Sequence, residues 1–220
     1  MKTLMLFGAS GYLGRGVADV LMKKDFDRIF LFSSRPLNYD IESAENILTG
    51  DLSIEENVKK VFDNIEIFTE DELYLFSSVG GFYGGKTIGE TPYEDWAKMF
   101  KLNVDIAFLL GKYFQVKVKN CKSGSICFTS ALSSFLPEKN KSAYVVSKNA
   151  LNFLVRVLSE EGLGQNYTAN AVAPFVLDSP ANREWADSNT RLVSPQAIGE
   201  LVNSVFDNSK ILTGNILKVY

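Results

Sequence analysis

Short apolar runs alternate with amphipathic stretches along nearly the whole chain. The apolar runs have the composition of β-strands and cover residues 3–10, 28–34, 45–51, 72–79, 124–130, 168–175 and 215–220. Stretches with helical spacing cover residues 15–24, 54–65, 93–115, 143–162 and 195–206. Strands that alternate with helices of this length indicate βαβ units and a parallel sheet that is covered on both faces.

This pattern predicts a single domain over residues 1–220. We expect an α/β fold of the Rossmann type, in which a doubly wound parallel sheet carries helices on both faces. The content of 46% hydrophobic and 22% charged residues is typical of one domain with a large core. The stretch 175–195 is polar, bounded by prolines and long for an irregular segment, which indicates a functional or mobile loop.

Glycines stand at the junction between the first predicted strand and the first helix, at Gly8, Gly11 and Gly14. In a dinucleotide-binding turn, such glycines permit the tight turn, the approach of the main chain to a pyrophosphate and the close packing of helix on strand. The helix N-terminus adds amide donors and a partial positive charge. An ordinary glycine-rich turn is the alternative. We predict that the cofactor contacts Gly8, Ser10, Gly11, Tyr12, Leu13 and Gly14.

The end of the second strand predicts the type of dinucleotide. A fold that binds NAD commonly places a carboxylate there for the ribose 2′-hydroxyl. In this chain Ser33, Ser34 and Arg35 occupy that place, and no acid occurs before Asp40. Hydroxyls and a guanidinium suit a 2′-phosphate, so NADP is favoured over NAD. The alternative is that Arg35 is a solvated loop charge.

The residue composition excludes several kinds of catalytic site and metal site. The chain has no histidine and two cysteines, Cys121 and Cys127, which excludes Cys/His metal clusters, Ser-His-Asp triads and Cys-His pairs. We expect no metal, a buried thiol at Cys127 and a reduced, cytoplasmic setting. A net charge of −3 gives no basic field for nucleic acid. The first apolar run is too short for a secretion signal, and no stretch reaches the ~18 apolar residues of a membrane span.

Without histidine, the best candidate for proton transfer is the pair Tyr144 and Lys148 in "YVVSK". Residues at i and i+4 lie on one face of a helix. An ammonium beside a phenol favours the phenolate, so we expect Lys148 to lower the pKa of Tyr144 from its reference near 10 by roughly 1–3 units. Tyr144 would then serve as a general acid near neutral pH.

Taken together, these residues resemble the short-chain dehydrogenase/reductase family over nearly the whole chain. The glycine spacing and the Tyr-x-x-x-Lys motif both match the family. The other segments that match, in the family's order, are "GDLS", "EDWAKMFKLNV", "GSICFTSA", "NAVAPF" and "ILTGNILKV".

The resemblance implies specific roles. Tyr144 would donate the proton, Lys148 would hold the nicotinamide ribose, and Asn103 would hold a water that relays protons; a purely structural Asn103 is the alternative. Asp51 would lie beside the adenine ring. The resemblance also implies a substrate-covering loop at 175–195 and pairing through the helix around residues 103–114 into a homodimer or homotetramer. Further cofactor contacts are expected from Ser34, Arg35, Leu52, Ser78, Val79, Gly80, Tyr144, Lys148, Pro174 and Val176.

The chain also departs from the family pattern. The usual catalytic serine stands thirteen residues before the tyrosine, which falls on Ala131. Ser130 and Ser133 are neighbours that could reach the substrate, although strand alternation points Ser130 away from the side that residue 131 faces. Loss of the serine costs roughly 10²–10³ in rate. Family members such as dihydropteridine reductase nevertheless operate without it.

Other departures affect the cofactor site. Phe175 replaces the glycine that usually follows Pro174, beside the expected nicotinamide site, and "SSVG" replaces the usual "NNAG" at residues 77–80. We therefore expect an NADP(H)-dependent oxidoreductase that reduces a small carbonyl, imine or quinonoid substrate, with Tyr144 as proton donor. The alternative is a catalytically weak NADP(H)-binding protein that senses redox state. Neither nucleic acid nor a membrane is an expected partner.

Overall fold

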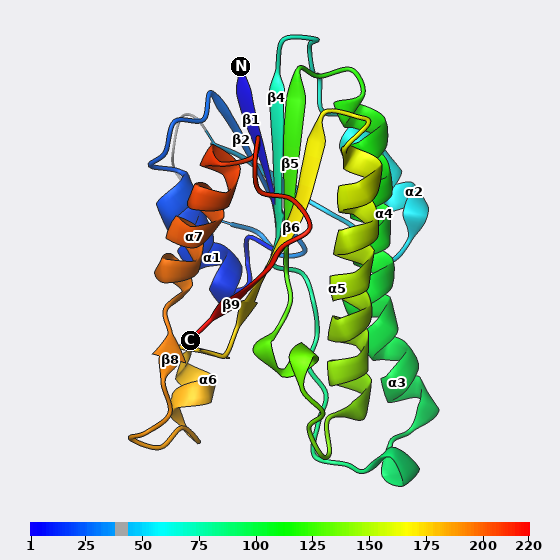
Figure 1. Cartoon of the computed structure of the whole chain (residues 1–220), viewed down its shortest axis with the longest axis vertical. Helices are drawn as coiled ribbons and strands as arrows, with labels where there is room; N and C mark the ends of the chain where they lie inside the picture. Colours follow the sequence, from blue (N-terminus) through cyan, green and yellow to red (C-terminus); the bar gives the residue numbers. More distant parts are fainter. Residues whose placement is uncertain (38–43) are drawn as a thin grey trace.

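A computed structural model describes residues 1–37 and 44–220, so Asp40 lies outside the described residues. Its centre is a parallel sheet with strand order β3-β2-β1-β4-β5-β6-β9 (Figure 1). The strands are β1 (Lys2–Phe7), β2 (Arg28–Ser33), β3 (Ala44–Leu48), β4 (Glu72–Ser77), β5 (Ser123–Thr129), β6 (Tyr167–Pro174) and β9 (Ile216–Val219). The order reverses between β1 and β4, which makes the doubly wound sheet of the Rossmann type and confirms the predicted fold class.

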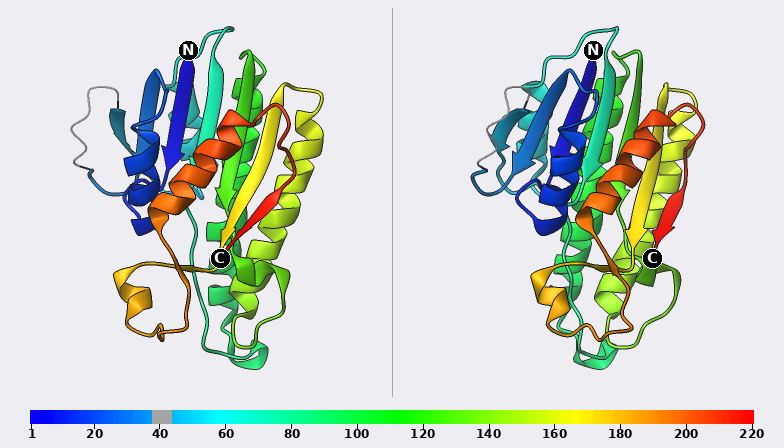
Figure 2. Two further views of the ribbon diagram at one scale, coloured as in Figure 1. Left: turned by 60° about the vertical axis from the view of Figure 1, so that its left-hand side comes forward. Right: turned by 90° about the vertical axis from the view of Figure 1, so that its left-hand side faces the viewer.

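Helices cover both faces of this sheet, as Figures 1 and 2 show. One face carries α1 (Tyr12–Leu21) and α7 (Pro195–Asp207), and the other carries α2 (Glu55–Asp63), α4 (Ile106–Val118) and α5 (Ser142–Gly162). Each face encloses its own apolar cluster, centred on Phe7 and Phe114 in one layer and on Leu6 and Phe76 in the other. Both faces of the central strands are therefore buried, which explains why these strands form almost continuous apolar runs rather than alternating ones. The edge strands β3 and β9 are partly exposed.

The helix predicted over residues 93–115 is interrupted. Helix α3 (Tyr93–Phe100) passes into a π-helical turn at Lys101–Asp105 before α4 begins. A π-turn displaces the hydrogen-bonding register of a helix and often occurs at functional sites. This turn carries Asn103, whose side chain is buried.

The carboxyl ends of the strands share one edge of the sheet, the lower edge in Figure 1, and the loops that follow them gather there. The segment 175–195 also lies at this edge. It is more ordered than its composition predicts, because it contains the short helix α6 (Pro180–Arg183) and a small parallel pair, β7 (Val176–Leu177) with β8 (Leu192–Val193). The Ser179 hydroxyl caps α6 by accepting from the Asn182 amide.

The predicted burial of Cys127 can be compared with this fold. Cys127 is a fully buried free thiol on β5, as expected, and Cys121 is also buried and free. Burial raises the pKa of the Cys127 thiol to about 12. Among the described residues, no helix is long and apolar enough to cross a membrane. In the same part of the chain, no three acidic, cysteine or histidine side chains are grouped so that they could bind a metal ion.

Candidate active site

The glycine loop between β1 and α1 is shaped to admit an anion. Gly8 has φ of +85°, a conformation that side chains disfavour, and its amide donates to Phe32 in β2. A Cβ at Gly14 would collide with the Gly8 carbonyl, so this glycine is required for close packing. Gly11 begins α1 without any side-chain cap. The first amides of the helix are therefore open to a bound phosphate, and the loop fits a dinucleotide.

The remaining residues of the loop differ in how far their side chains are exposed to a ligand. Tyr12 is exposed and Ser10 is half-buried, whereas the Leu13 side chain packs into the core. Only the main chain of Leu13 is therefore free to contact a ligand. Ser78 fastens the loop from the neighbouring strand, since its hydroxyl lies 3.2 Å from the carbonyl oxygens of both Phe7 and Gly8.

Arg35 lies just beyond the end of β2 and is exposed, as is Ser34. The hydroxyl of Ser33 donates to the main-chain carbonyl of Arg35 over 2.5 Å and shapes the turn. Within the described residues, no hydrogen bond or ion pair holds the Arg35 guanidinium. It is therefore available to an anionic ligand.

Asp51 and Leu52 follow β3 and lie near the start of α2. The Asp51 carboxylate accepts from the amide and the hydroxyl of Ser53, which lower its pKa, and it pairs with Lys101 over 3.5 Å. Asp51 thereby retains an ordered carboxylate at the surface, while the Leu52 side chain is buried in the core.

Tyr144 and Lys148 lie one turn apart on α5, as their spacing predicts. The Lys148 side chain is 4% exposed, and its ammonium donates to the Thr129 carbonyl oxygen over 2.7 Å. Gly80 lies against it, because a Cβ at Gly80 would come within 3.0 Å of Lys148 Nζ. Lys148 is thus enclosed by the ends of β4 and β5.

The expected effect of Lys148 on Tyr144 is wrong for this structure. Burial, together with the negative charge of Glu138, raises the pKa of Tyr144 to about 12. Burial lowers the pKa of Lys148 to about 8. Removal of water disfavours the charged form of each group, and the Lys148 ammonium is directed at Thr129 rather than at the phenol.

Asn103 uses its side chain to join two elements. Its Oδ1 accepts from the Gly81 amide over 2.9 Å, and its Nδ2 donates to the Gly81 carbonyl over 3.1 Å and to the Ser147 hydroxyl over 3.0 Å. Ser147 in turn donates to the Tyr144 carbonyl over 2.9 Å. Asn103 therefore connects the loop after β4 to the helix turn that carries Tyr144.

Ser130 and Ser133, the two neighbours of position 131 that the sequence analysis considered, differ in the structure. Ala131 is 5% exposed at the end of β5. The Ser130 hydroxyl is buried and donates to Asn152, with Ser134 at 3.4 Å, so its hydrogen bonds do not run to Tyr144. Ser133 is half-buried, and within the described residues no hydrogen bond engages its hydroxyl.

Several residues of this region carry no motif that sequence analysis would single out. The Phe82 ring meets the Tyr144 ring edge-on, with centroids 4.9 Å apart and planes at 68°, yet Phe82 stays 65% exposed. The Lys218 ammonium lies 4.4 Å above the Phe135 ring. The only signal for Phe82 was its position just after "SVGG" at the end of β4.

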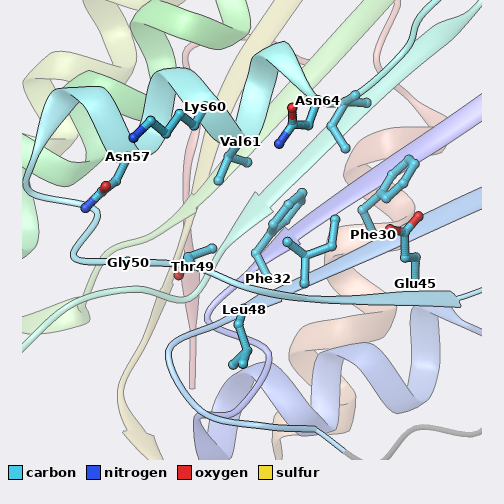
Figure 3. Close-up of a pocket in the computed structure, with 12 residues that line it drawn as sticks. Phe30, Phe32, Glu45, Leu48, Thr49, Gly50, Asn57, Lys60, Val61 and Asn64 are labelled. Atoms are coloured by element: carbon cyan, nitrogen blue, oxygen red, sulfur yellow. The ribbon is translucent and has the colours of Figure 1, made fainter.

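The segment after β6 provides the opposite wall. Pro174 ends β6, and the amide of Phe175 donates to the Val219 carbonyl over 2.9 Å. The Phe175 side chain is 51% exposed, so it is not packed into the core, and Val176 begins β7. A pocket also exists away from this region. It has a volume of about 310 Å³ and lies between α2 and the sheet at β2 and β3. Figure 3 shows Phe32 on the sheet, Asn57 on the helix and Asn64 just past its end.

Comparisons with known proteins agree with this geometry. A family profile described as short chain dehydrogenase matches residues 2–190. Short chain aldehyde dehydrogenase 1 of Euphorbia lathyris is 35% identical over 143 residues, which cover 62% of this chain and 49% of that protein. Dihydropteridine reductase of Dictyostelium discoideum is 24% identical over 226 residues, which cover 99% of this chain and 94% of that protein.

Solved structures give the same fold. A structure described as ElxO with NADP bound has a TM-score of 0.87 at 18% identity and covers 99% of this chain and 96% of that one. Acetoin dehydrogenase from Enterobacter cloacae has a TM-score of 0.80 at 21% identity, covering 99% of this chain and 93% of that one. The chain spans about half the length of the Euphorbia protein, and about half the length of a chloroplastic NADPH-dependent aldehyde reductase-like protein of Arabidopsis thaliana.

Proposed function

Because this chain belongs to the short chain dehydrogenase family, we propose that it is an NADP(H)-dependent oxidoreductase that reduces a small carbonyl, imine or quinonoid substrate. The observation that carries the proposal is the arrangement of Tyr144 and Lys148 on α5, with Lys148 enclosed beside Gly80 and Thr129. A lysine buried in this way has a strongly perturbed pKa, which is typical of a functional site.

The cofactor would lie across the carboxyl edge of the sheet. Its pyrophosphate would sit at the amides of the Gly8–Gly14 loop, and its adenine would lie near Asp51. Lys148, at the other end, would hold the nicotinamide ribose. When bound, the cofactor supplies the hydride for the reaction.

The preference for NADP rests on Arg35. Its guanidinium is exposed at the end of β2 and has no partner among the described residues, and Ser34 lies beside it. Guanidinium groups bind phosphate through charge-assisted hydrogen bonds. A solved structure with NADP bound shares this fold, which is compatible with the same cofactor here.

Tyr144 would hold the proton that the substrate receives. Its raised pKa keeps the phenol protonated through neutral pH, which suits a donor in the direction of reduction. Asn103 and Ser147 would hold the Tyr144 turn in register with the loop after β4. Lys148 would keep a positive charge close to the reacting groups at pH values below about 8.

The substrate would be easily reduced and planar. Ala131 cannot donate a hydrogen bond, so the reacting oxygen or nitrogen would lack one donor that is worth roughly 10²–10³ in rate. A conjugated quinonoid ring needs less such help than an ordinary ketone. Phe82 presents an exposed aromatic ring edge-on to Tyr144, against which a flat ring could stack. The match with a dihydropteridine reductase over 99% of this chain supports the same substrate class.

The segment 175–195 would cover the substrate, and residues 1–220 would act as one catalytic domain. Within the segment, the Arg183 guanidinium donates two hydrogen bonds to the Asp178 carboxylate, from Nε to Oδ1 and from Nη2 to Oδ2. This bidentate pair stiffens α6. Trp185 is 62% exposed at the end of this helix and is free to close over a ligand.

We also propose that the protein assembles as a homodimer or homotetramer. Helices α4 and α5 cover the same face of the sheet, and both expose large apolar side chains, among them Phe108 at 53% and Phe153 at 66% exposure. Exposed aromatic groups of this size are typical of protein interfaces.

Calorimetric titration with NADPH and with NADH tests the cofactor assignment. We expect clear binding of NADPH and weaker binding of NADH. Turnover is then measured by NADPH oxidation with a quinonoid methyl-dihydropterin, with phenanthrenequinone and with benzaldehyde, and we expect the quinonoid compounds to react faster. Binding of NADPH without turnover of any of them would instead favour a redox-sensing role, whereas no binding of either dinucleotide would refute both functions.

A further inference from the structure

A polar cluster lies buried between α5 and the turn that follows β5. Its members are Ser130, Ser134 and Asn152, which are 2%, 3% and 4% exposed. Ser130 Oγ donates to Asn152 Oδ1 over 2.5 Å, and Asn152 Nδ2 donates to Ser134 Oγ over 2.7 Å. Both ends of the Asn152 amide are thus used, and a buried amide with all its partners is costly to disturb.

This cluster continues the stripe of α5 that carries the proposed catalytic pair. Tyr144, Lys148 and Asn152 stand at i, i+4 and i+8 and so share one helix face. Lys148 holds the carbonyl of Thr129, and Asn152 holds the hydroxyl of the next residue, Ser130. Side chains from successive turns of α5 therefore form hydrogen bonds with successive residues at the end of β5.

The same cluster holds the main chain at Ala131. Ser134 Oγ donates to the Ala131 carbonyl over 2.6 Å, and the Ser134 amide donates to the same oxygen over 3.0 Å. From outside, Asn149 Nδ2 donates to the Ser134 carbonyl over 3.0 Å. The turn of residues 130–135 is therefore fixed from both sides, although no side chain at 131 can bind a substrate.

We propose that Asn152 is a positioning residue that acts through Ser130 and Ser134 to hold the 130–135 turn against Tyr144. The inference rests on the proposed function. In place of a serine hydroxyl at 131, the fixed shape of this turn orients the substrate for the proton on Tyr144. Small displacements of a reacting group cost about 10²-fold in rate, so a loosened turn lowers turnover.

The first test compares Asn152→Leu with Asn170→Leu, since leucine has the same branching and number of side-chain heavy atoms as asparagine but no hydrogen-bonding group. Asn170 is a matched control because it is fully buried and its amide is also used at both ends, by Leu212 and Asn215. Hydrogen exchange is measured on the full chain. We expect amides of residues 130–135 to exchange about tenfold faster in Asn152→Leu only. Unchanged exchange there overturns the proposal, whether or not a substrate is known.

The second test separates positioning from simple stability. We expect Asn152→Leu to lower kcat about tenfold with the quinonoid methyl-dihydropterin and to leave the NADPH Kd within about twofold of wild type. The double variant Ser130→Ala/Asn152→Leu removes both partners of the Ser130–Asn152 hydrogen bond, so neither is left buried without the other. It should recover thermal stability without recovering kcat. If kcat recovers together with Tm, the role of Asn152 is structural only.

A milder variant guards against misfolding. Asn149 is exposed and reaches the cluster only at the Ser134 carbonyl, so Asn149→Ala should fold normally. We expect it to lower kcat by about twofold to fivefold with an unchanged NADPH Kd. If the wild-type protein binds no NADPH, the proposed function is refuted. If the wild-type protein reduces the quinonoid substrate and Asn152→Leu does so with the same kcat, only this inference is refuted.

Discussion

The ammonium of Lys148 donates a hydrogen bond to the main-chain carbonyl of Thr129 over 2.7 Å, and this contact fastens α5 to the end of β5. It brings a charged group to a place where water is excluded. Burial consequently lowers the pKa of Lys148 to about 8. The same placement that joins α5 to the end of β5 thus also removes the lysine from water, and the removal of water lowers its pKa.

This burial makes stability depend on pH in a defined direction. As pH falls, the unfolded chain protonates Lys148 near its ordinary pKa of 10.5, while the folded chain does so only near 8. The resulting cost to folding is complete below about pH 8 and fades as the pH rises to about 10.5. The free energy of unfolding of the wild type, relative to Lys148→Met, should therefore increase across this range. Urea unfolding at a series of pH values measures it, and a constant difference would contradict the cause assigned to the pKa.

Replacement of Tyr144 by phenylalanine should abolish reduction. The ring and its contact with Phe82 remain, but the proton is lost, and general acid catalysis contributes about 10²–10⁴-fold. The NADPH Kd, measured by calorimetry, should not change. Tyr113→Phe is the matched control, since Tyr113 is a half-buried residue of α4 whose hydroxyl donates to Glu55. Turnover by Tyr144→Phe at the wild-type rate would exclude the acid role.

Restoring a hydroxyl at position 131 should extend the substrate range. Ala131→Ser supplies a hydrogen-bond donor that the proposed site lacks, and we expect it to raise kcat/KM for benzaldehyde by about tenfold or more, with a smaller gain for the quinonoid methyl-dihydropterin. Steady-state kinetics with both substrates check this. No gain with either substrate would mean that position 131 does not face the reacting atom, and equal gains would contradict the expected difference between the two substrates.

Arg35→Ala should weaken NADPH binding by about tenfold and leave NADH binding unchanged, because only NADPH carries the 2′-phosphate. Calorimetry with both dinucleotides measures the effect, and the effect should diminish at high salt. Arg156→Ala, at an exposed arginine on α5, is the control. If NADH binding falls as much as NADPH binding, Arg35 does not select the phosphate.

Phe153→Glu should reduce the oligomeric state. Phe153 is 66% exposed on α5, and a carboxylate in a paired apolar face would be desolvated without a partner. Light scattering measures the mass, and Phe68→Glu provides a control at an exposed phenylalanine in the loop between α2 and β4. A wild-type mass equal to that of one chain would refute the proposed assembly.

Local patterns in the sequence determined much of the fold. The alternation of apolar runs and helical stretches was sufficient to predict the parallel sheet, because the central strands are buried on both faces. The long helix around Asn103 was predicted as continuous, since a π-turn changes only hydrogen-bond register and leaves helical spacing nearly intact. The short elements within residues 175–195 were missed because strands of two residues carry no usable periodicity.

The sequence by itself determined the glycine loop, the i and i+4 placement of Tyr144 and Lys148 and the absence of a serine at Ala131, since each depends only on residue type and local spacing. The tertiary structure decided where the polar groups point. Ser130 turns to Asn152, twenty-two residues away, and Lys148 turns to Thr129 rather than to the phenol. Partners distant in sequence and the loss of water on packing set these directions and the pKa values, and neither is written in a local pattern.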